Sequence, residues 1–522
     1  MNNLTKEGME QALQICAAEP IHQMGTIQPH GAALVLSADS LRTVLQASAN
    51  MDQFMDLPAG WALGKPLVEL MGEDSALQIE QLLQKAQAHK TASGLVSASY
   101  QQVAVNLDAY LYRSNEFWVL ELCQDSGLPK REQLGELLMH MQDSLLTIET
   151  ETETETDIIY YFEQVARLVH ELTGYDNVMV YRFEANWDGE VVAQSRVEAA
   201  TSYLGSRFPA SDIPAQAREL YTKNRIRILT DVGAKAVPIL PLLNPLTQQP
   251  LDMTYSALRS LSPIHLEYLC NMEVQATMTI SLLQNGRLWG LIACHHLTPK
   301  RVSFAMREAV LFISRMISTE ITAIETRKER VLLGKVARIK TKLLKSIVSH
   351  SESAVLYNLS TDLLDIVEAS GLIVVVEGSR YLQGEVPEPA AIDALLDWLG
   401  KQPITDVFNC DHLAEQFAPA SAYPEIVSGI IATIFSSDMR NCVVWLRKER
   451  LRTVKWAGSY EQGLVQTPAG DFRLGPRNSF ECWSELWRGR SAVWSLLEIN
   501  IVKDFGQSLS ESLAQKHHAR LA

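Results

Sequence analysis

The sequence predicts an α+β protein built from three tandem domains joined by long helices. The chain has 522 residues, which at roughly 150 residues per domain corresponds to three or four domains. Three stretches mix short strand-like runs with helical patterns, and helical or polar segments separate them. No proline occurs between Pro299 and Pro387, and apolar residues recur there every three or four positions. That spacing predicts a long amphipathic helix.

The composition excludes several classes of protein. Lys plus Arg is 46 and Asp plus Glu is 61, so the net charge is −15, which argues against a nucleic-acid or anionic-membrane partner because both need a basic face. No apolar run approaches the roughly 20 residues of a membrane helix. Seven cysteines without paired spacing fit a reducing compartment. The polar N-terminus lacks a secretory pattern, and we expect a cytoplasmic protein.

The first stretch extends to about Cys123. Its strand-like runs are residues 32–36, 95–100 and 117–122. A Gly-Leu-Pro turn signal at 127–129 precedes a helical pattern at 134–145. Residues 149–156 alternate Glu and Thr, and their like charges indicate a solvated loop or helix cap.

The second stretch contains the most motifs. Residues 177–183 and 189–194 are typical of strands, and 277–283 with 289–295 form a hairpin pattern around Asn285 and Gly286. Two helices are expected to begin with a capping residue and a proline in the first turn, one within 211–216 and one at Ser262 and Pro263. A helix N-terminus also offers free N–H groups to an anionic ligand.

The third stretch follows the long helix. The apolar seam from Val310 to Ile347 predicts a helix that bridges two domains or pairs with a second copy. Residues 371–377 and 442–447 are strand-like, and 456–480 are rich in turns. Residues 491–522 again form an amphipathic helical pattern.

No common enzyme template is present. The chain has no Gly-Lys-Ser/Thr phosphate loop, HExxH, GxSxG or CxxC pair. His295 and His296 are adjacent in a strand and therefore point to opposite faces, so they do not chelate one metal ion. Considered singly, Cys16 is a buried thiol, His265 a structural histidine, and each arginine a surface charge.

Six groups of residues, taken in order, closely resemble the bacteriophytochrome family. They are CAAEPIH at 16–22 with GTIQPHG at 25–31, YRF at 181–183 with DGEVV at 188–192, FPASDIPAQAR at 208–218, RSLSPIHLEYL at 259–269, WGLIACHH at 289–296, and GPRNSF at 475–480 with WAG at 456–458. Their order and spacing match the family over essentially the whole chain.

The resemblance implies PAS, GAF and PHY domains, with antiparallel sheets flanked by helices. The expected boundaries are 1–128 for the N-terminal segment and PAS domain, 129–305 for the chromophore-binding GAF domain, 306–505 for the connecting helix and PHY domain, and 506–522 for a helical linker. The PHY domain is expected to extend a tongue hairpin at about 453–485, and the N-terminus to form a knot.

The resemblance also implies a biliverdin IXα cofactor joined by a thioether to Cys16. Other family members use a cysteine immediately before the conserved GAF histidine, and here that position is Ile264, which has no thiol. A thiolate is the nucleophile that adds to the vinyl-derived side chain of ring A. Cys270 remains an alternative attachment site.

The remaining pocket roles are likewise implied by matching positions. Arg227 and Arg259 would pair with the propionates, since guanidinium stays charged and binds carboxylates bidentately. Thr277 and Thr279 would hydrogen-bond a propionate, and His265 with the Asp212 carbonyl would hold the pyrrole nitrogens. The other expected chromophore-binding residues are Met179, Tyr181, Tyr203, Phe208, Ile213, Pro214, Tyr221, Ser262, Tyr268 and His295.

The implied function is a red/far-red light switch rather than an enzyme. Isomerisation at the bridge between rings C and D would change hydrogen bonds near Asp212, which pairs with Arg477 of the tongue in one state, with Ser479 as the alternative tongue contact. The tongue would refold and signal to a partner copy through a helical spine. An output domain, a histidine kinase or a diguanylate cyclase, would follow residue 522, and the sequence does not choose between them.

Other classes of function stay open from the residues alone. A GAF domain can bind a cyclic nucleotide or haem, although neither requires Cys16 or the tongue motif. A light-insensitive scaffold that has lost its pigment is the second alternative. The sequence departs from the family pattern in three places: Ala17 and Ala18 stand where an acidic residue is common, Asn177 replaces an arginine, and Glu273 replaces a glycine.

Overall fold

The structure is a computed structural model that describes most of the chain. The described residues are 18–55, 59–100, 103–124, 135, 139, 155–349, 362–376, 378–403, 407–435, 439, 441–458, 464–466, 472–474 and 479–521. The chain divides into two compact units, one of residues 1–322 with 455–483 and the other of residues 323–454 with 484–522. The units are described separately below.

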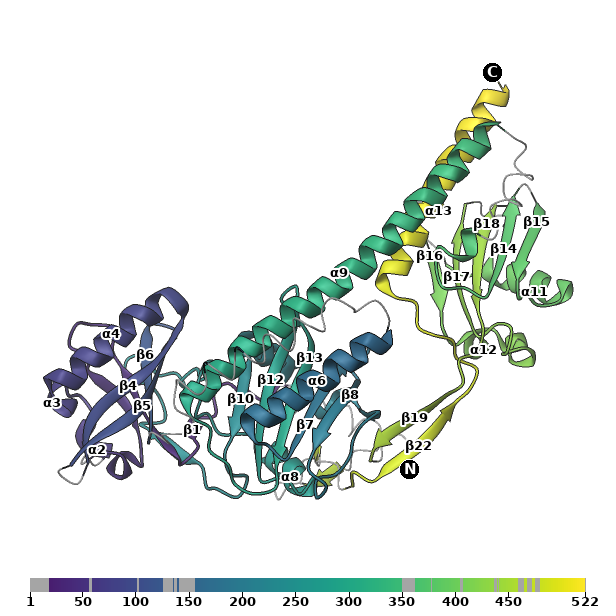
Figure 1. The fold of residues 1–522 in the computed structure, drawn as a ribbon. Helices are drawn as coiled ribbons and strands as arrows, with labels where there is room; N and C mark the ends of the chain where they lie inside the picture. The colour runs from purple at the N-terminus through teal and green to yellow at the C-terminus, as the bar shows by residue number, and fades with distance from the viewer. Residues whose placement is uncertain are drawn as a thin grey trace. The chain divides into compact units, whose positions relative to one another are not determined.

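The first sheet of the first unit has seven strands in the order β1-β11-β3-β2-β6-β5-β4 (Figure 1). All three strands predicted in this stretch are present, while β3 and β5 were not predicted. The helix α4 (Glu73–His89) packs on β4 and buries Ile79, Leu82 and Leu83. The elements of this domain are β1 (Thr26–Ile27), β2 (Gly31–Leu36), β3 (Val44–Ser48), α2 (Ala59–Ala62), α3 (Leu67–Met71), β4 (Thr91–Tyr100), β5 (Val103–Ser114) and β6 (Phe117–Gln124).

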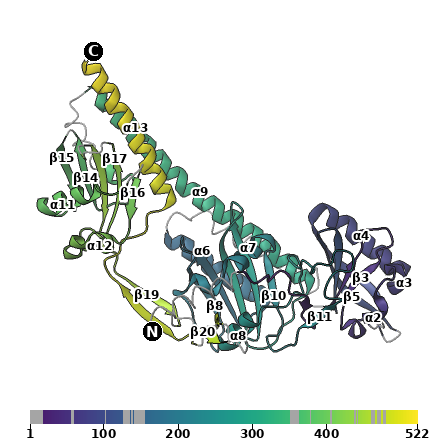
Figure 2. The same ribbon diagram turned by 180° about the vertical axis from the view of Figure 1, so that it is seen from behind.

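The strand β11 (Val237–Leu240) joins this sheet from a distant part of the sequence (Figure 2). It pairs with β1 through Ile27 and Val237 and with β3 through Ser48 and Ile239. On its other side, Ile27 forms an isolated bridge with Arg259. The N-terminal segment is therefore bonded on two sides by residues 237–259.

The second sheet of this unit has eight strands in the order β10-β12-β13-β7-β8-β9-β19-β22. Side chains alternate along each strand, so Met179 and Tyr181 lie on the face opposite Val178 and Val180. The helix α6 (Glu155–Thr173) packs on β7 and β8. The strands are β7 (Asn177–Phe183), β8 (Gly189–Arg196), β9 (Ser206–Phe208), β10 (Ile226–Leu229), β12 (Ala276–Gln284), β13 (Arg287–His296), β19 (Arg452–Ala457) and β22 (Cys482–Trp487).

The predicted hairpin β12–β13 is confirmed. Asn285 and Gly286 both have positive φ, 49° and 78°, as the two central residues of a type I′ turn require. The N-terminal part of α9 (Phe304–Ser349) contacts this hairpin. The hydroxyl of Ser314 donates to the Ser281 carbonyl at 2.6 Å. The long helix predicted from the proline-free stretch is therefore present.

The two predicted helix starts have different outcomes. Ser262 occupies the N-cap of α8 (Pro263–Asn271) with Pro263 in the first turn, as predicted, but its hydroxyl does not cap the helix and donates instead to Glu19. The prediction for residues 211–216 is wrong in detail. Pro214 is itself the N-cap residue of α7 (Ala215–Lys223), and no side chain caps that helix.

The tongue residues of the first unit extend the eight-stranded sheet. Lys455 and Trp456 on β19 pair in parallel with Ser206 and Arg207 on β9. Gly458 has φ +85°, and a Cβ placed there would lie 1.9 Å from the Ser479 carbonyl oxygen, so the two arms approach as closely as glycine permits. The strands β20 (Leu464–Gln466) and β21 (Phe472–Leu474) form a separate two-stranded sheet.

The second unit is built on a five-stranded antiparallel sheet in the order β15-β14-β18-β17-β16. Alternate residues of β14 enter two cores: Ile373 packs with α11, whereas Leu372 and Val374 pack with α13 and the second half of α9. Both predicted strands are present. The main elements are β14 (Gly371–Val376), β15 (Ser379–Gly384), α11 (Pro389–Leu399), β16 (Val407–Cys410), α12 (Leu413–Gln416), β17 (Gly429–Ile434), β18 (Cys442–Arg447) and α13 (Leu496–Leu521).

The α+β fold class with tandem sheet domains is thus confirmed. The predicted amphipathic tail is α13, whose Ile501, Phe505 and Leu509 are buried. Most of the helical pattern at 134–145 and of the Glu/Thr insert at 149–156 lies outside the described residues. None of the described helices combines the length and apolarity needed to cross a membrane.

Candidate functional site

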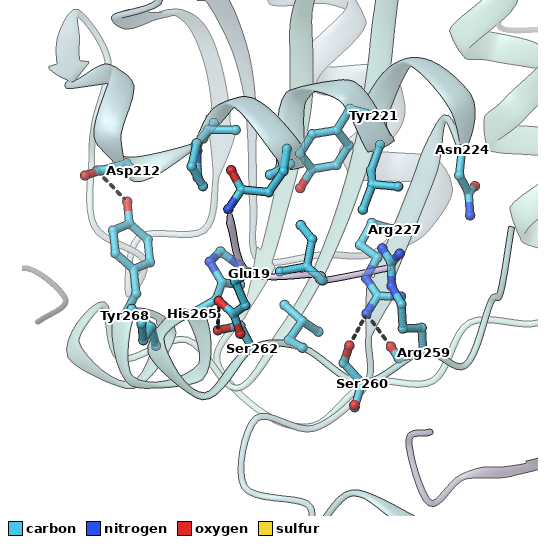
Figure 3. Close-up of a pocket in the computed structure, with 18 of the residues that line it drawn as sticks. Glu19, Asp212, Tyr221, Asn224, Arg227, Arg259, Ser260, Ser262, His265 and Tyr268 are labelled. Atoms are coloured by element: carbon cyan, nitrogen blue, oxygen red, sulfur yellow. Dashed lines mark hydrogen bonds between the residues drawn. The ribbon is translucent and has the colours of Figure 1, made fainter. Parts of the chain in front are cut away.

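A deep cleft opens in the first unit between α7, α8, β10 and the N-terminal segment (Figure 3). It encloses about 1160 Å³, including space open to solvent at its mouth. A second cavity, of about 710 Å³ by the same measure, lies against the face of the sheet that carries Tyr181. The two cavities share five lining residues, so they are adjoining parts of one site: Asp212, Ile213, Tyr221, His265 and Tyr268.

Two arginines, Arg227 and Arg259, line the cleft together with the acidic residues Glu19 and Asp212. The Nη2 atom of Arg227, on β10, donates to the backbone carbonyls of Arg259 and Ser260, the latter at 2.8 Å. The Nη1 atoms of Arg227 and Arg259 are buried without a hydrogen-bond partner among the described residues. Burial and repulsion from Arg259 hold the pKa of Arg227 well below its usual value. Such a pair is stabilised by an anionic ligand.

A histidine and a tyrosine on α8 face the centre of the site. His265 and Tyr268 lie one helical turn apart, with ring centroids 5.7 Å apart and planes at 9°. The Tyr268 hydroxyl donates to Oδ2 of Asp212 at 3.0 Å, and Figure 3 shows this bond across the cleft. Burial and the nearby Arg227 lower the pKa of His265 to about 4. The imidazole is therefore neutral near pH 7 and can both donate and accept.

The strand residues of the second cavity come from β7, β8, β9, β12 and β13. Thr277 and His295 are cross-strand partners, and Thr279 lies two residues along on the same face. Burial, and then His265, lowers the pKa of His295 to about 4, and its Nδ1 is buried without a partner among the described residues. His296 instead points away and pairs with Asp176 at 2.7 Å. The prediction that the two histidines face opposite sides is thus confirmed.

The first cleft also contains residues that sequence reasoning missed. Glu19 lines it and accepts a hydrogen bond from Ser262 at 3.2 Å, although it is only three residues from Cys16. Leu269 on α8 and Met272 at its C-cap follow His265 at helical spacing and line the second cavity. Leu291 and Ala293 alternate with His295, a signal visible in the sequence. Other lining residues that were not predicted are Ile21, Ser211, Gln216, Ala217, Leu220, Asn224, Ile226, Ser260, Leu261 and Val191.

The predicted site residues are largely brought together. Tyr203 does not line either cavity, and its ring instead packs on Phe208 with centroids 5.6 Å apart. Cys16 and Arg477 lie outside the described residues. Ser479 is exposed and its hydroxyl accepts from Glu481 N at 3.2 Å. The remaining residues line the site: Met179, Tyr181, Phe208, Asp212, Ile213, Pro214, Tyr221, Arg227, Arg259, Ser262, His265, Tyr268, Thr277, Thr279 and His295.

The tongue touches this site through an aromatic contact. Phe480 packs edge-on against Tyr268 with ring centroids 4.9 Å apart. Cys482 lies 3.5 Å from the hydroxyl of Ser206. Among the described residues, no group of three His, Cys, Asp or Glu side chains could hold a metal ion.

Comparisons with known proteins identify the family. Residues 16–123 match the PAS fold, 157–321 the GAF domain and 336–518 the phytochrome region. A bacteriophytochrome of Pseudomonas aeruginosa is 32% identical over 97% of this chain and 67% of its own length. The chain belongs to the phytochrome family. Together these matches describe a phytochrome photosensory module.

Other phytochromes are similar to this chain in sequence and in structure. Cyanobacterial phytochrome B of a Nostoc species is 35% identical over 97% of this chain. The chain spans only 66% of that relative's length. Among solved structures, a bacteriophytochrome of R. palustris has a TM-score of 0.81 at 30% identity, covering 96% of this chain and 99% of its own. The photosensory core of a Stigmatella aurantiaca phytochrome has a TM-score of 0.79 at 33% identity, covering 96% and 98%.

Proposed function

We propose that this phytochrome module binds biliverdin IXα covalently at Cys16 and reports red and far-red light to an output domain. The observation that carries the proposal is the pair of buried guanidinium groups, Arg227 and Arg259, whose Nη1 atoms have no partner among the described residues. They line a cleft of about 1160 Å³. Among the described residues, no carboxylate forms an ion pair with either arginine. A bilin carries two propionates, which match two arginines.

The attachment at Cys16 is supported by the path of the chain. Glu19 and Ile21 line the cleft, and three residues of chain reach at most about 11 Å, so the Cys16 thiol is within range of a pigment held there. Ile264 lines the same cleft but has no thiol. Cys270, the alternative, is exposed and lines neither cavity.

The neutral histidines suit the centre and far end of the pigment. His265 would hold the pyrrole N–H groups with the Asp212 carbonyl, and His295 would offer its unpartnered Nδ1 to a ring carbonyl as donor. A bound bilin supplies light absorption and isomerisation at the bridge between its rings C and D. The residues around that end are mainly apolar or aromatic, which leaves them able to repack: Met179, Tyr181, Phe208, Leu269 and Met272.

The switch we propose begins at Asp212. Its carboxylate accepts a hydrogen bond from Tyr268, and Tyr268 also contacts Phe480 of the tongue. A change in the pigment that breaks the Tyr268 bond would shift Asp212 between a state in which it pairs with Arg477 and a state in which it does not. Ser479 is the alternative tongue contact, and this exchange would bias the tongue between two folds.

The signal would pass through a homodimer. In the first unit α9 leaves Phe312 exposed, and in the second unit Val331 and Leu333 are exposed. We propose that such residues form the helical spine between two copies, which light scattering tests directly: a mass of about twice 58.3 kDa supports the proposal and a monomer contradicts it.

Covalent attachment is tested by assembling the protein with biliverdin, denaturing it and detecting bound pigment on a gel by zinc fluorescence. The wild type should fluoresce, Cys16→Ala should not, and Cys270→Ala should behave as the wild type. Fluorescence retained in Cys16→Ala and lost in Cys270→Ala would move the attachment to Cys270. A protein that binds no pigment at all, beside a control that assembles, would support a light-insensitive scaffold.

A further inference from the structure

One buried carboxylate of the PAS domain reaches the segment that carries Arg259. Glu121, on β6, is fully buried. Its Oε1 accepts a hydrogen bond from the Ser256 hydroxyl. Its Oε2 accepts from the backbone N–H groups of Ala257, at 2.8 Å, and Leu258, at 3.2 Å. A single side chain thus fixes three successive residues of another domain.

The hydrogen bonds continue to Arg259 itself. The Ser256 hydroxyl oxygen accepts from the backbone N–H of Arg259 at 2.8 Å. The carbonyl of Arg259 in turn accepts from Nη2 of Arg227. The backbone position of Arg259 therefore sets both guanidinium groups of the cleft, and Glu121 is at the start of this series of bonds.

Burial and hydrogen bonding act on Glu121 in opposite directions. Burial raises the pKa of this carboxyl above its usual value, and the hydrogen bonds from Ser256 and Ala257, with the Arg307 charge, offset only part of that rise. Both backbone N–H groups meet Oε2, so this oxygen is an acceptor in either protonation state. Replacing one oxygen by an amide nitrogen would remove an acceptor that these donors use.

Gln28 holds the same segment through its carbonyl groups, not through the N–H of Arg259. The backbone N–H of Gln28 donates to the Leu258 carbonyl at 2.7 Å. Its side-chain Nε2 donates to the Ile228 carbonyl at 2.8 Å and to the Arg259 carbonyl at 3.4 Å. The segment thus keeps its general course without Glu121. Glu121 fixes the local backbone geometry of residues 256–259, from which the Arg259 side chain extends into the cleft.

We propose that Glu121 is a positioning residue for the carboxylate-binding site, acting on Arg259 through Ser256. It touches neither the cleft nor the ligand, since it lines neither cavity. This inference rests on the proposed function for the identity of the ligand. A purely structural role would weaken binding of any pigment alike, whereas a positioning role selects for a ligand that carries the propionate charge.

The test compares biliverdin with its dimethyl ester, in which both carboxylates are neutralised. The Cys16→Ala background makes binding reversible, so that covalent capture does not hide weaker affinity. Glu121→Gln keeps the size of the side chain but replaces one acceptor oxygen by a donor amide. It should weaken biliverdin binding about tenfold and ester binding less than about twofold.

Two serine variants provide the matched comparison. Ser256→Ala removes the hydroxyl that links Glu121 to Arg259, and should weaken biliverdin about threefold to fivefold without affecting the ester. Ser48 is also fully buried, and its hydroxyl accepts from the Ala33 N–H at 3.0 Å in the same sheet. Ser48→Ala should therefore leave the ratio of the two affinities unchanged.

Equal losses for the two pigments, or no loss for biliverdin, would overturn the inference. Binding of neither pigment by the Cys16→Ala parent and by the wild type would overturn the proposed function instead. In that case amide hydrogen exchange in the pigment-free protein still tests whether Glu121 holds residues 256–259. The Leu258 and Arg259 amides should exchange faster in Glu121→Gln and in Ser256→Ala, and unchanged exchange would refute the role of Glu121 in holding them.

Discussion

The Tyr268 hydroxyl donates a hydrogen bond to Oδ2 of Asp212 at 3.0 Å, and so joins α8 to the short turn before α7. The Tyr268 ring also forms an edge contact with Phe480 of the tongue. One residue therefore connects the floor of the cleft, the acid expected to take part in switching, and the element expected to refold.

Tyr268→Phe removes this bond while keeping the ring contact with Phe480. A hydrogen bond to a charged acceptor contributes about 1.5–3 kcal/mol, so releasing Asp212 should change the rate of dark reversion about tenfold or more. The return of absorbance after illumination measures that rate. A rate within about twofold of the wild type would show that the bond does not distinguish the two states.

Gly458→Ala should disrupt the tongue. Its φ of +85° is strained for alanine, and a Cβ would also meet the Ser479 carbonyl at 1.9 Å. Gly205 is the matched control, because its φ is +73° but no atom lies within 4 Å of the added carbon. Gly205→Ala should cost about 1 kcal/mol, and Gly458→Ala clearly more. Thermal unfolding and limited proteolysis of the tongue measure both, and equal effects would contradict the close approach.

Glu273→Gly should stabilise the protein. Glu273 has φ +59° directly after α8, in the left-handed region where a side chain costs about 1 kcal/mol. Asn285→Gly, at φ 49°, should gain less because asparagine tolerates this conformation. Denaturant unfolding of the two variants tests the difference. A loss of stability in Glu273→Gly would mean that its side chain makes a compensating contact.

Acid should destabilise the pigment-free protein between pH 6.5 and about 4. The pKa values of His265 and His295 are lowered to about 4, so between these limits the unfolded chain binds more protons than the folded one and stability falls as pH falls. Each histidine should contribute about 1–2 kcal/mol, less than the full shift because both line a cavity open to water. Unfolding free energies from pH 7 to 4 should show a shallower fall in His265→Gln and in His295→Gln. If the unfolding free energy fell equally with pH in the wild type and in both variants, the lowered pKa values of His265 and His295 would be contradicted.

Local patterns were sufficient to predict many elements, whereas the pocket residues were predicted from the resemblance to the family. The Asn285-Gly286 turn identified the hairpin that carries Thr277, Thr279 and His295, because turn chemistry acts over a few residues. The family motifs then located the arginines and His265. These signals are short-range or depend on matching positions, and they do not need the tertiary structure.

Long-range pairings could not be predicted in this way. The strand β11 joins a sheet built from residues far earlier in the chain, and Val237 gives no local sign of its partner Ile27. Glu121 occurs in an apolar strand where a buried carboxylate is unexpected, and only the fold brings Ser256 to it. Ser262 was predicted as a helix cap, but tertiary contact with Glu19 gives its hydroxyl a different partner.

We expect the cleft beside Arg227 and His265 to hold a light-switching bilin. The most direct test is the absorption spectrum of the full chain assembled with biliverdin, recorded in the dark, after red light and again after far-red light. We expect two spectral forms that interconvert reversibly, and weaker biliverdin binding in Arg227→Ala. A bound pigment whose spectrum does not respond to either colour, or a wild type that binds no pigment beside a control that assembles, would contradict it.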